Sequence, residues 1–251
     1  MTGLLAAEVR KLSTARTTWI LTAIGAAFAG FGAGFFLFEE AFSGPFTGSD
    51  PQVAAAIDQV GGMSVIVLVV GVLSLTTEFR HATIGRTLQI TPSRTRVLTA
   101  KLVVGAAYGV VYFVASLGVV AVLIGIAATG TDLELGAEVR EALWHGPVGL
   151  ALTAVFGVAV GALLRSQVVA ITVSLVYVML VETLVNQFAP QVARWLPFQA
   201  LNALFLSDEA MGQMPEGMVS PLPPGTALGV FVAYVAAFSV AAVWLLRARD
   251  V

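Results

Sequence analysis

The chain contains no cysteine and few charged residues. The absence of cysteine excludes disulfide bonds, thiolate nucleophiles and metal sites with cysteine ligands. Only 11% of the 251 residues are charged, whereas 58% are apolar. A water-soluble globule of this length needs more polar surface than this composition supplies. The composition therefore predicts a protein whose main solvent is a membrane.

Several motifs of enzymes and of other membrane folds are also missing. No G-x-x-x-x-G-K-[ST] loop occurs, so we do not expect the chain itself to hydrolyse ATP. Neither H-E-x-x-H nor G-x-S-x-G occurs, which argues against an intramembrane hydrolase. The short alternating segments typical of an outer-membrane barrel are absent as well, so we expect the spanning elements to be helices.

Long apolar runs dominate the sequence. Each run is close to the roughly 20 residues that a helix needs to cross the hydrocarbon core. They predict an all-α, polytopic membrane protein, a single transmembrane domain over 1–251. Because the first run is longer than the apolar part of a secretory signal, we expect it to be an uncleaved anchor. The six predicted transmembrane helices lie at about 17–38, 60–77, 102–128, 147–164, 168–188 and 226–246.

Lys and Arg are unevenly distributed among the segments that join these runs. Most of them lie at the two ends of the chain and in 78–101, whereas most Asp and Glu lie in the remaining connections. Since Lys and Arg favour the cytoplasmic side, both termini are predicted to be inside. The two histidines, His81 and His145, then lie on opposite sides of the membrane, and no metal site is expected.

The segment 78–101 is a basic island between the second and third predicted spans, with five of the 13 Lys and Arg residues. Thr91 can cap a helix that has Pro92 in its first turn and continues through Lys101 into the third span. Gly85 would break the segment before it. We therefore expect a short cytoplasmic helix at an angle to the membrane. On charge alone, its basic residues would mark topology and contact anionic lipid head groups. The side chains expected to point outward are those of Arg86, Arg94 and Arg96.

Three short segments carry a family resemblance when taken in order. The island reads Glu78-Phe79-Arg80, then Thr83 and Gly85, then Thr91-Pro92-Ser93-Arg94 and a closing Lys101. Before it stand Glu8-Val9-Arg10-Lys11-Leu12 and Arg16, and after it come Glu182, Pro190 and Trp195-Leu196-Pro197. Over essentially its whole length the chain resembles the permease subunits of bacterial type-2 ABC exporters, the ABC-2 family.

The resemblance implies a function and a set of partners. It implies ATP-driven export of a hydrophobic or amphipathic substrate, such as a drug, lipid or peptide, through the bacterial cytoplasmic (inner) membrane. The basic island would be a coupling helix seated in a groove of a separate ATP-binding subunit. ATP and Mg²⁺ would bind that subunit, and this chain would hold no cofactor. A second permease would complete a homodimer or heterodimer in the lipid bilayer, and no nucleic acid is expected. The residues with the ATPase-coupling role would be Glu78, Arg80, Gly85, Arg86, Thr91, Pro92, Arg94, Arg96 and Lys101.

The first residues predict an amphipathic helix at the inner membrane interface. Leu4, Leu5, Val9 and Leu12 recur at helical spacing, with charged residues on the other faces. Such a helix would either anchor the chain ahead of the first span or brace the same partner as the island. Its candidate interface residues are Glu8, Arg10, Lys11 and Arg16.

Glu182 is the only acidic residue inside a predicted span, in the outer third of the fifth helix. A charge there should face the bundle or a cavity, with Asn186, Gln187, Gln199 or Asn202 as candidate hydrogen-bond partners. Glu182, Asn186 and Gln187 would form either part of an outer gate or an interhelical link.

The segment 190–206 contains an apolar stretch that is too short to cross the membrane. A seventh span would also place the basic C-terminal residues outside, against the charge distribution. The stretch from Trp195 to Leu206 therefore predicts either a re-entrant helix or a helix lying flat in the outer interface.

Two other functions remain open from the residues alone: a gradient-driven carrier, and a membrane assembly factor that does not transport. A carrier usually has charged groups or broken helices near the midplane, often within inverted repeats. Neither feature is visible in this sequence, so the exporter is the leading hypothesis.

Overall fold

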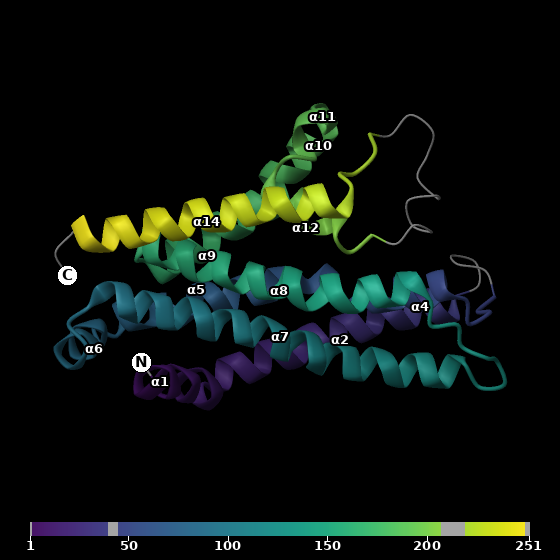
Figure 1. Cartoon of the computed structure of the whole chain (residues 1–251), viewed down its shortest axis with the longest axis horizontal. Helices are drawn as coiled ribbons and strands as arrows, with labels where there is room; N and C mark the ends of the chain where they lie inside the picture. The colour runs from purple at the N-terminus through teal and green to yellow at the C-terminus, as the bar shows by residue number, and fades with distance from the viewer. Residues whose placement is uncertain (1, 40–44, 207–218, 249–251) are drawn as a thin grey trace.

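The computed structural model describes residues 2–39, 45–206 and 219–248, and the regular structure in these ranges is entirely helical, as predicted (Figure 1). The longest helices lie side by side. The α- and π-helical elements are α1 (Thr2–Thr14), α2 (Arg16–Phe38), α4 (Asp50–Asp58), α5 (Ser64–Arg80), α6 (Ile84–Ile90), α7 (Arg94–Ala127), α8 (Ala137–Leu164), α9 (Gln167–Val176), η2 (Tyr177–Val181), α10 (Glu182–Phe188), α11 (Pro190–Ala193), α12 (Pro197–Ala203) and α14 (Pro224–Ala248).

Six helical segments within the described residues are long and apolar enough to cross a membrane, which confirms the predicted number of spans. Every one of them overlaps a predicted run. The segments are Arg16–Phe38, Asp50–Arg80, Arg94–Ala127, Ala137–Leu164, Gln167–Phe188 and Pro224–Leu246.

The second and fourth spans begin earlier than the apolar runs do. In the second, α4 precedes a 3₁₀ turn at Gly61–Met63, and the residues from Gln52 to Ile57 are buried by neighbouring helices rather than exposed to lipid. In the fourth, α8 begins at Ala137 and continues through Pro147. Packing against the bundle thus lets polar or proline-containing turns extend helices that hydropathy alone would end.

The start of α7 corrects the helix predicted over Thr91 to Lys101. The helix begins at Arg94, and the side chain of Ser93, not of Thr91, accepts the Arg96 backbone N–H at 3.4 Å. Since the residue before a proline favours extended backbone, Pro92 keeps Thr91 out of a helical start. From Arg94 the helix runs without a break to Ala127, so the basic turns belong to the third span itself.

The break that sets off the short helix α6 is at Ala82, not at Gly85, which lies inside α6. Ala82 has a φ of 53°, in the left-handed region. The Thr83 N–H donates to the Glu78 carbonyl at 3.0 Å and the Ala82 N–H donates to the Phe79 carbonyl at 3.2 Å. These two bonds are those of a Schellman motif, which ends α5 and turns the chain into α6.

Helices α5, α7 and α8 form the centre of the bundle. A Cβ atom at Gly71 would clash with the backbone of α8, and one at Gly157 would clash with the backbone of α5. The two glycines therefore let α5 and α8 approach backbone to backbone. Gly105 and Gly109 likewise face α8, so these small residues pack helices within one chain.

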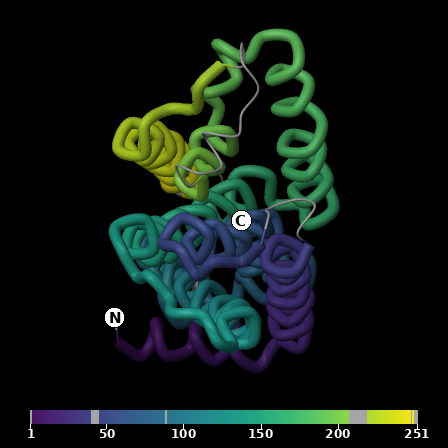
Figure 2. Tube along the Cα trace, turned by 90° about the vertical axis from the view of Figure 1, so that its right-hand side faces the viewer, coloured from purple at the N-terminus to yellow at the C-terminus, as the bar shows by residue number. Residues whose placement is uncertain are grey.

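Helix α1 lies across the end of the bundle. In Figure 2, which looks along the bundle, α1 is seen from its side while the long helices are seen closer to end-on. The Trp19 indole N–H donates to the Ser13 carbonyl at 2.6 Å and fixes the corner between α1 and α2. This orientation is that of an interface helix.

The fifth span leads away from the bundle, and α12 returns into it (Figures 1 and 2). Phe198 and Leu201 of α12 are buried, and the Phe198 ring contacts Phe156 of α8 and Phe231 of α14. The short helix is therefore held inside the bundle by its apolar side chains and does not lie on the surface.

Candidate functional site

One end of the bundle, which we call the α6 end, carries α1, α6 and the last turns of α14 (Figure 1). Two of the sequence segments singled out above, the N-terminal segment and the basic island, meet there. Four charged side chains connect them: Glu8 and Lys11 from α1, Glu78 from α5 and Lys101 from α7.

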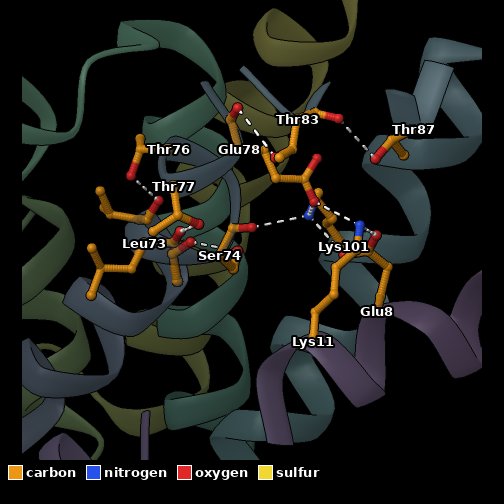
Figure 3. Close-up of polar contacts among 12 residues, drawn as sticks. Glu8, Lys11, Leu73, Ser74, Thr76, Thr77, Glu78, Thr83, Thr87 and Lys101 are labelled. Carbon is orange, nitrogen blue, oxygen red and sulfur yellow. Dashed lines mark hydrogen bonds and ion pairs between the residues drawn. The ribbon is translucent and has the colours of Figure 1, made fainter. Parts of the chain in front are cut away.

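These four side chains form a closed ring in which the charges alternate (Figure 3). Lys101 Nζ lies 2.7 Å from Glu8 Oε2 and 2.7 Å from Glu78 Oε1. Lys11 Nζ lies 2.7 Å from Glu8 Oε1 and 2.8 Å from Glu78 Oε1. We call this arrangement the charge ring.

Three of the four side chains in the charge ring are buried. The exposed fraction of the side chain is 1% for Lys101, 5% for Glu8 and 7% for Glu78, against 45% for Lys11. Burying an ion costs several kcal/mol unless partners replace its water, and this ring is neutral as a whole. Lys101 has an acceptor for each ammonium hydrogen, because the Ser74 carbonyl accepts the third at 3.0 Å.

Lys11 closes the ring on its solvent side. Burial by itself would lower the pKa of Lys11, but the hydrogen bonds to Glu78 and Glu8 outweigh it, and the pKa is raised above 10.5. Lys11 is therefore charged throughout the physiological pH range, and the ring keeps its fourth charge.

Two members of the ring, Glu78 and Lys101, were expected to contact a partner directly. Glu78 and Lys101 face inward, so neither side chain is part of the outer surface. The sequence analysis placed both residues in the basic island between the second and third spans. Their pairing with Glu8 was not foreseen, because residues so distant along the chain carry no spacing signal.

Arg94 also differs from the expectation that it points outward. Its guanidinium donates to the Leu246 carbonyl at 2.9 Å, which is among the carbonyls that the last turn of α14 leaves without a helical partner. Arg94 thus ties the third span to the sixth. Arg96, two residues further along α7, is exposed as predicted.

The remaining residues of the island lie on or around α6. Ile84 packs inward, whereas Gly85, Arg86 and Ile90 are exposed, and Ile90 has 86% of its surface free. Thr91 ends α6 with its N–H bonded to the Thr87 carbonyl, and Pro92 is exposed in the connection to α7. Arg80, at the end of α5, donates to the Gln167 side chain at 3.3 Å.

The interface helix presents two faces of different character. Its inner face carries Glu8 into the charge ring, and its outer face exposes Arg10, with Arg16 exposed at the start of α2. The buried carboxylate of Glu8 is the feature that an amphipathic pattern built on leucines does not reveal.

Glu182 is fully buried and caps α12. Its two carboxylate oxygens accept the backbone N–H groups of Phe198 at 3.1 Å and Gln199 at 2.9 Å. These two partners are backbone donors, and Asn186 and Gln187, proposed from the sequence as partners, are exposed. The π-helical turn η2 comes directly before Glu182 in the fifth span.

Asp50 plays the same part for another helix. Its carboxylate accepts the N–H groups of Gly136 at 2.7 Å, Glu138 at 3.0 Å and Val139 at 3.1 Å, at the N-terminus of α8. Sequence reasoning missed this cap, because Asp50 lies 86 residues before Gly136 and no local pattern connects the two. Across the described residues, no group of three His, Cys, Asp or Glu side chains is placed to hold a metal ion.

Comparison with known proteins identifies the family. The family model described as "ABC-2 family transporter protein" matches residues 4–181, from within α1 to the end of η2. No curated protein matches the chain. The match covers well over half of the sequence, including α6 and all four members of the charge ring. The chain therefore belongs to the ABC-2 family, the membrane-spanning permeases of ABC transporters.

Proposed function

We propose that this permease is the transmembrane subunit of an ATP-driven exporter and that α6 is the surface on which the ATP-binding subunit docks. The observation that carries the proposal is the position of α6. It projects at the α6 end between the second and third spans, and it exposes Arg86, Gln89 and Ile90. An isoleucine with 86% of its surface free, next to a basic residue, is typical of a contact point for a protein groove.

The charges support a cytoplasmic location for this end. Because Lys and Arg favour the cytoplasmic side of a membrane, an end with several exposed arginines is expected to face inward. Those arginines are Arg10, Arg16, Arg80, Arg86 and Arg96.

The energy would come from the partner. The chain lacks a phosphate-binding loop, so ATP and Mg²⁺ would be held by the ATP-binding subunit. We place the assembly in the bacterial cytoplasmic (inner) membrane, paired with a second permease as a homodimer or heterodimer. A hydrophobic or amphipathic substrate, such as a drug, lipid or peptide, suits the apolar walls of the spans.

A gradient-driven carrier or an assembly factor is the alternative. A carrier needs ionisable groups that can exchange ions near the midplane. Here Glu182 is bonded to two backbone N–H groups, and the charge ring lies at the α6 end. Both arrangements favour structural roles over ion exchange, which supports the exporter.

The test is co-purification with the cognate ATP-binding subunit. The variant Arg86→Glu with Ile90→Asp adds repulsion and removes the apolar anchor, so we expect recovery of the partner to fall at least about tenfold. The matched control, Arg140→Glu with Leu135→Asp, makes the same changes at exposed positions at the opposite end and should retain the partner. Native recovery with the α6 variant would contradict docking through α6.

A further inference from the structure

The charge ring lies at the root of α6 and shares a residue with it. The Glu78 side chain belongs to the ring, while the Glu78 backbone carbonyl accepts the Thr83 N–H at 3.0 Å in the turn that leads into α6. The position of α6 and the position of the ring are therefore set by the same residue. Figure 3 shows Thr83 of this turn, and Thr87 of α6 bonded to it, near the ring.

On the other side of the ring, α1 is joined to the first span by a single residue. Ala15 separates α1 from α2, and its extended backbone (φ −73°, ψ 112°) makes the corner. The Trp19 indole N–H, bonded to the Ser13 carbonyl at 2.6 Å, holds this corner closed. A displacement of α1 is therefore passed to the start of α2.

The ring also has an unused acceptor. Glu78 Oε1 accepts from both Lys11 and Lys101, while Glu78 Oε2 is buried and no described group donates to it. A small rotation of this carboxyl would give each lysine its own oxygen without loss of any ion pair. The ring can therefore adjust its geometry and still hold its three helices together.

From these observations we propose that the charge ring is the joint that transmits the position of α6 to α1 and the first span. The inference rests on the proposed function, since it takes docking of an ATP-binding subunit on α6 as the source of movement. Glu8 and Lys11 are then positioning residues. Through them, α1 and the attached α2 follow any movement of the α5–α6–α7 unit.

The decisive variant cuts α1 out of the ring and leaves the remaining pair intact. Glu8→Gln with Lys11→Gln changes no net charge, and the Glu78–Lys101 ion pair at 2.7 Å remains. The α5–α6–α7 unit, and with it docking of the partner, should survive. The matched control is Arg10→Gln, an exposed position of α1 outside the ring.

The readout is a distance between spin labels in the complex with the ATP-binding subunit, with and without a non-hydrolysable ATP analogue and Mg²⁺. Because the chain has no cysteine, labels can be placed cleanly at Thr17→Cys on α2 and Val168→Cys on α9, both exposed. We expect the nucleotide to shift this distance in the native chain and in the Arg10→Gln control, and the shift to be lost in Glu8→Gln with Lys11→Gln.

A second variant tests the same proposal independently, in case the first variant misfolds. Three glycines inserted between Ala15 and Arg16 leave the ring untouched but disconnect α1 from α2, so the shift should again be lost. If either variant binds the partner and shows the native shift, the charge ring is not the joint. A native complex in which nucleotide leaves the distance unchanged would also overturn it. Failure of the native chain to bind the partner would instead refute the proposed function.

Discussion

Ala82 and Arg165 are non-glycine residues in the left-handed region, each with a φ of 53°. Both end a helix at the α6 end: Ala82 follows α5, and Arg165 ends α8 with its guanidinium 5.7 Å from the centre of the Phe79 ring. A residue with a Cβ atom in this conformation costs roughly 1–2 kcal/mol. The Schellman bonds around Ala82 hold it there and so fix the direction of α6.

Replacing Ala82 with glycine should stabilise the protein by about 1 kcal/mol, because glycine adopts positive φ without steric cost. Thermal unfolding in detergent measures the change. The control is Ala7→Gly in α1, an exposed and helical position, which should destabilise by about 1 kcal/mol. If both substitutions destabilised the protein equally, Ala82 would not have the left-handed conformation of a Schellman motif.

At the scale of the helices, α7 has an unusual length. Its 34 residues make a helix of about 51 Å at 1.5 Å per residue, well beyond a hydrocarbon core of about 30 Å. The extra turns lie at its basic start, where Lys101 enters the charge ring and Arg94 reaches α14. The third span therefore extends into the α6 end, where it joins α1 and α5 through Lys101 and α14 through Arg94.

The bond from Arg94 to the Leu246 carbonyl should hold the last turn of α14 in place. A charge-assisted hydrogen bond contributes about 1.5–3 kcal/mol, so we expect Arg94→Met to fray this turn. Hydrogen exchange of the α14 amides measures the effect, which should be faster exchange confined to the end of the helix. Arg96→Met, at an exposed position on the same helix, should leave it unchanged. Slow exchange in Arg94→Met would mean that other contacts fix α14.

The helices that could be predicted from the sequence are those that hydropathy marks. The six spans were predictable because an apolar run is a local property of the sequence. The start of α8 was not, since Asp50 caps it from a distant helix. Lys101 was assigned to the basic island, but its burial depends on Glu8, a residue on another helix that no local pattern connects to it. Long-range pairing of charges is thus the part of the site that sequence reasoning missed.

For the whole molecule, the two ends of the bundle differ in charge. Exposed arginines gather at the α6 end, and Asp132, Glu134 and Glu141 are exposed in and near the connection from α7 to α8. The positive-inside tendency then predicts a single orientation, with both termini in the cytoplasm.

Single cysteines in the cysteine-free chain test this orientation. A cysteine at Gln89, exposed on α6, should react with a membrane-impermeant thiol reagent only from the cytoplasmic side. One at Asp132, exposed between α7 and α8, should react only from outside. The reverse pattern would invert the topology and would remove the basis for docking at α6.

The charge ring also has a consequence for the order of synthesis. Glu8 and Lys11 leave the ribosome before Glu78 and Lys101 exist, so the ring cannot close until the chain has been made as far as Lys101, near the start of the third span. While the chain is being inserted, we expect Lys11 and Lys101 to count among the basic residues that orient it. In the finished fold, carboxylates cancel both charges. The same two lysines would then guide insertion first and hold helices together afterwards, while the exposed arginines would carry the orientation signal throughout.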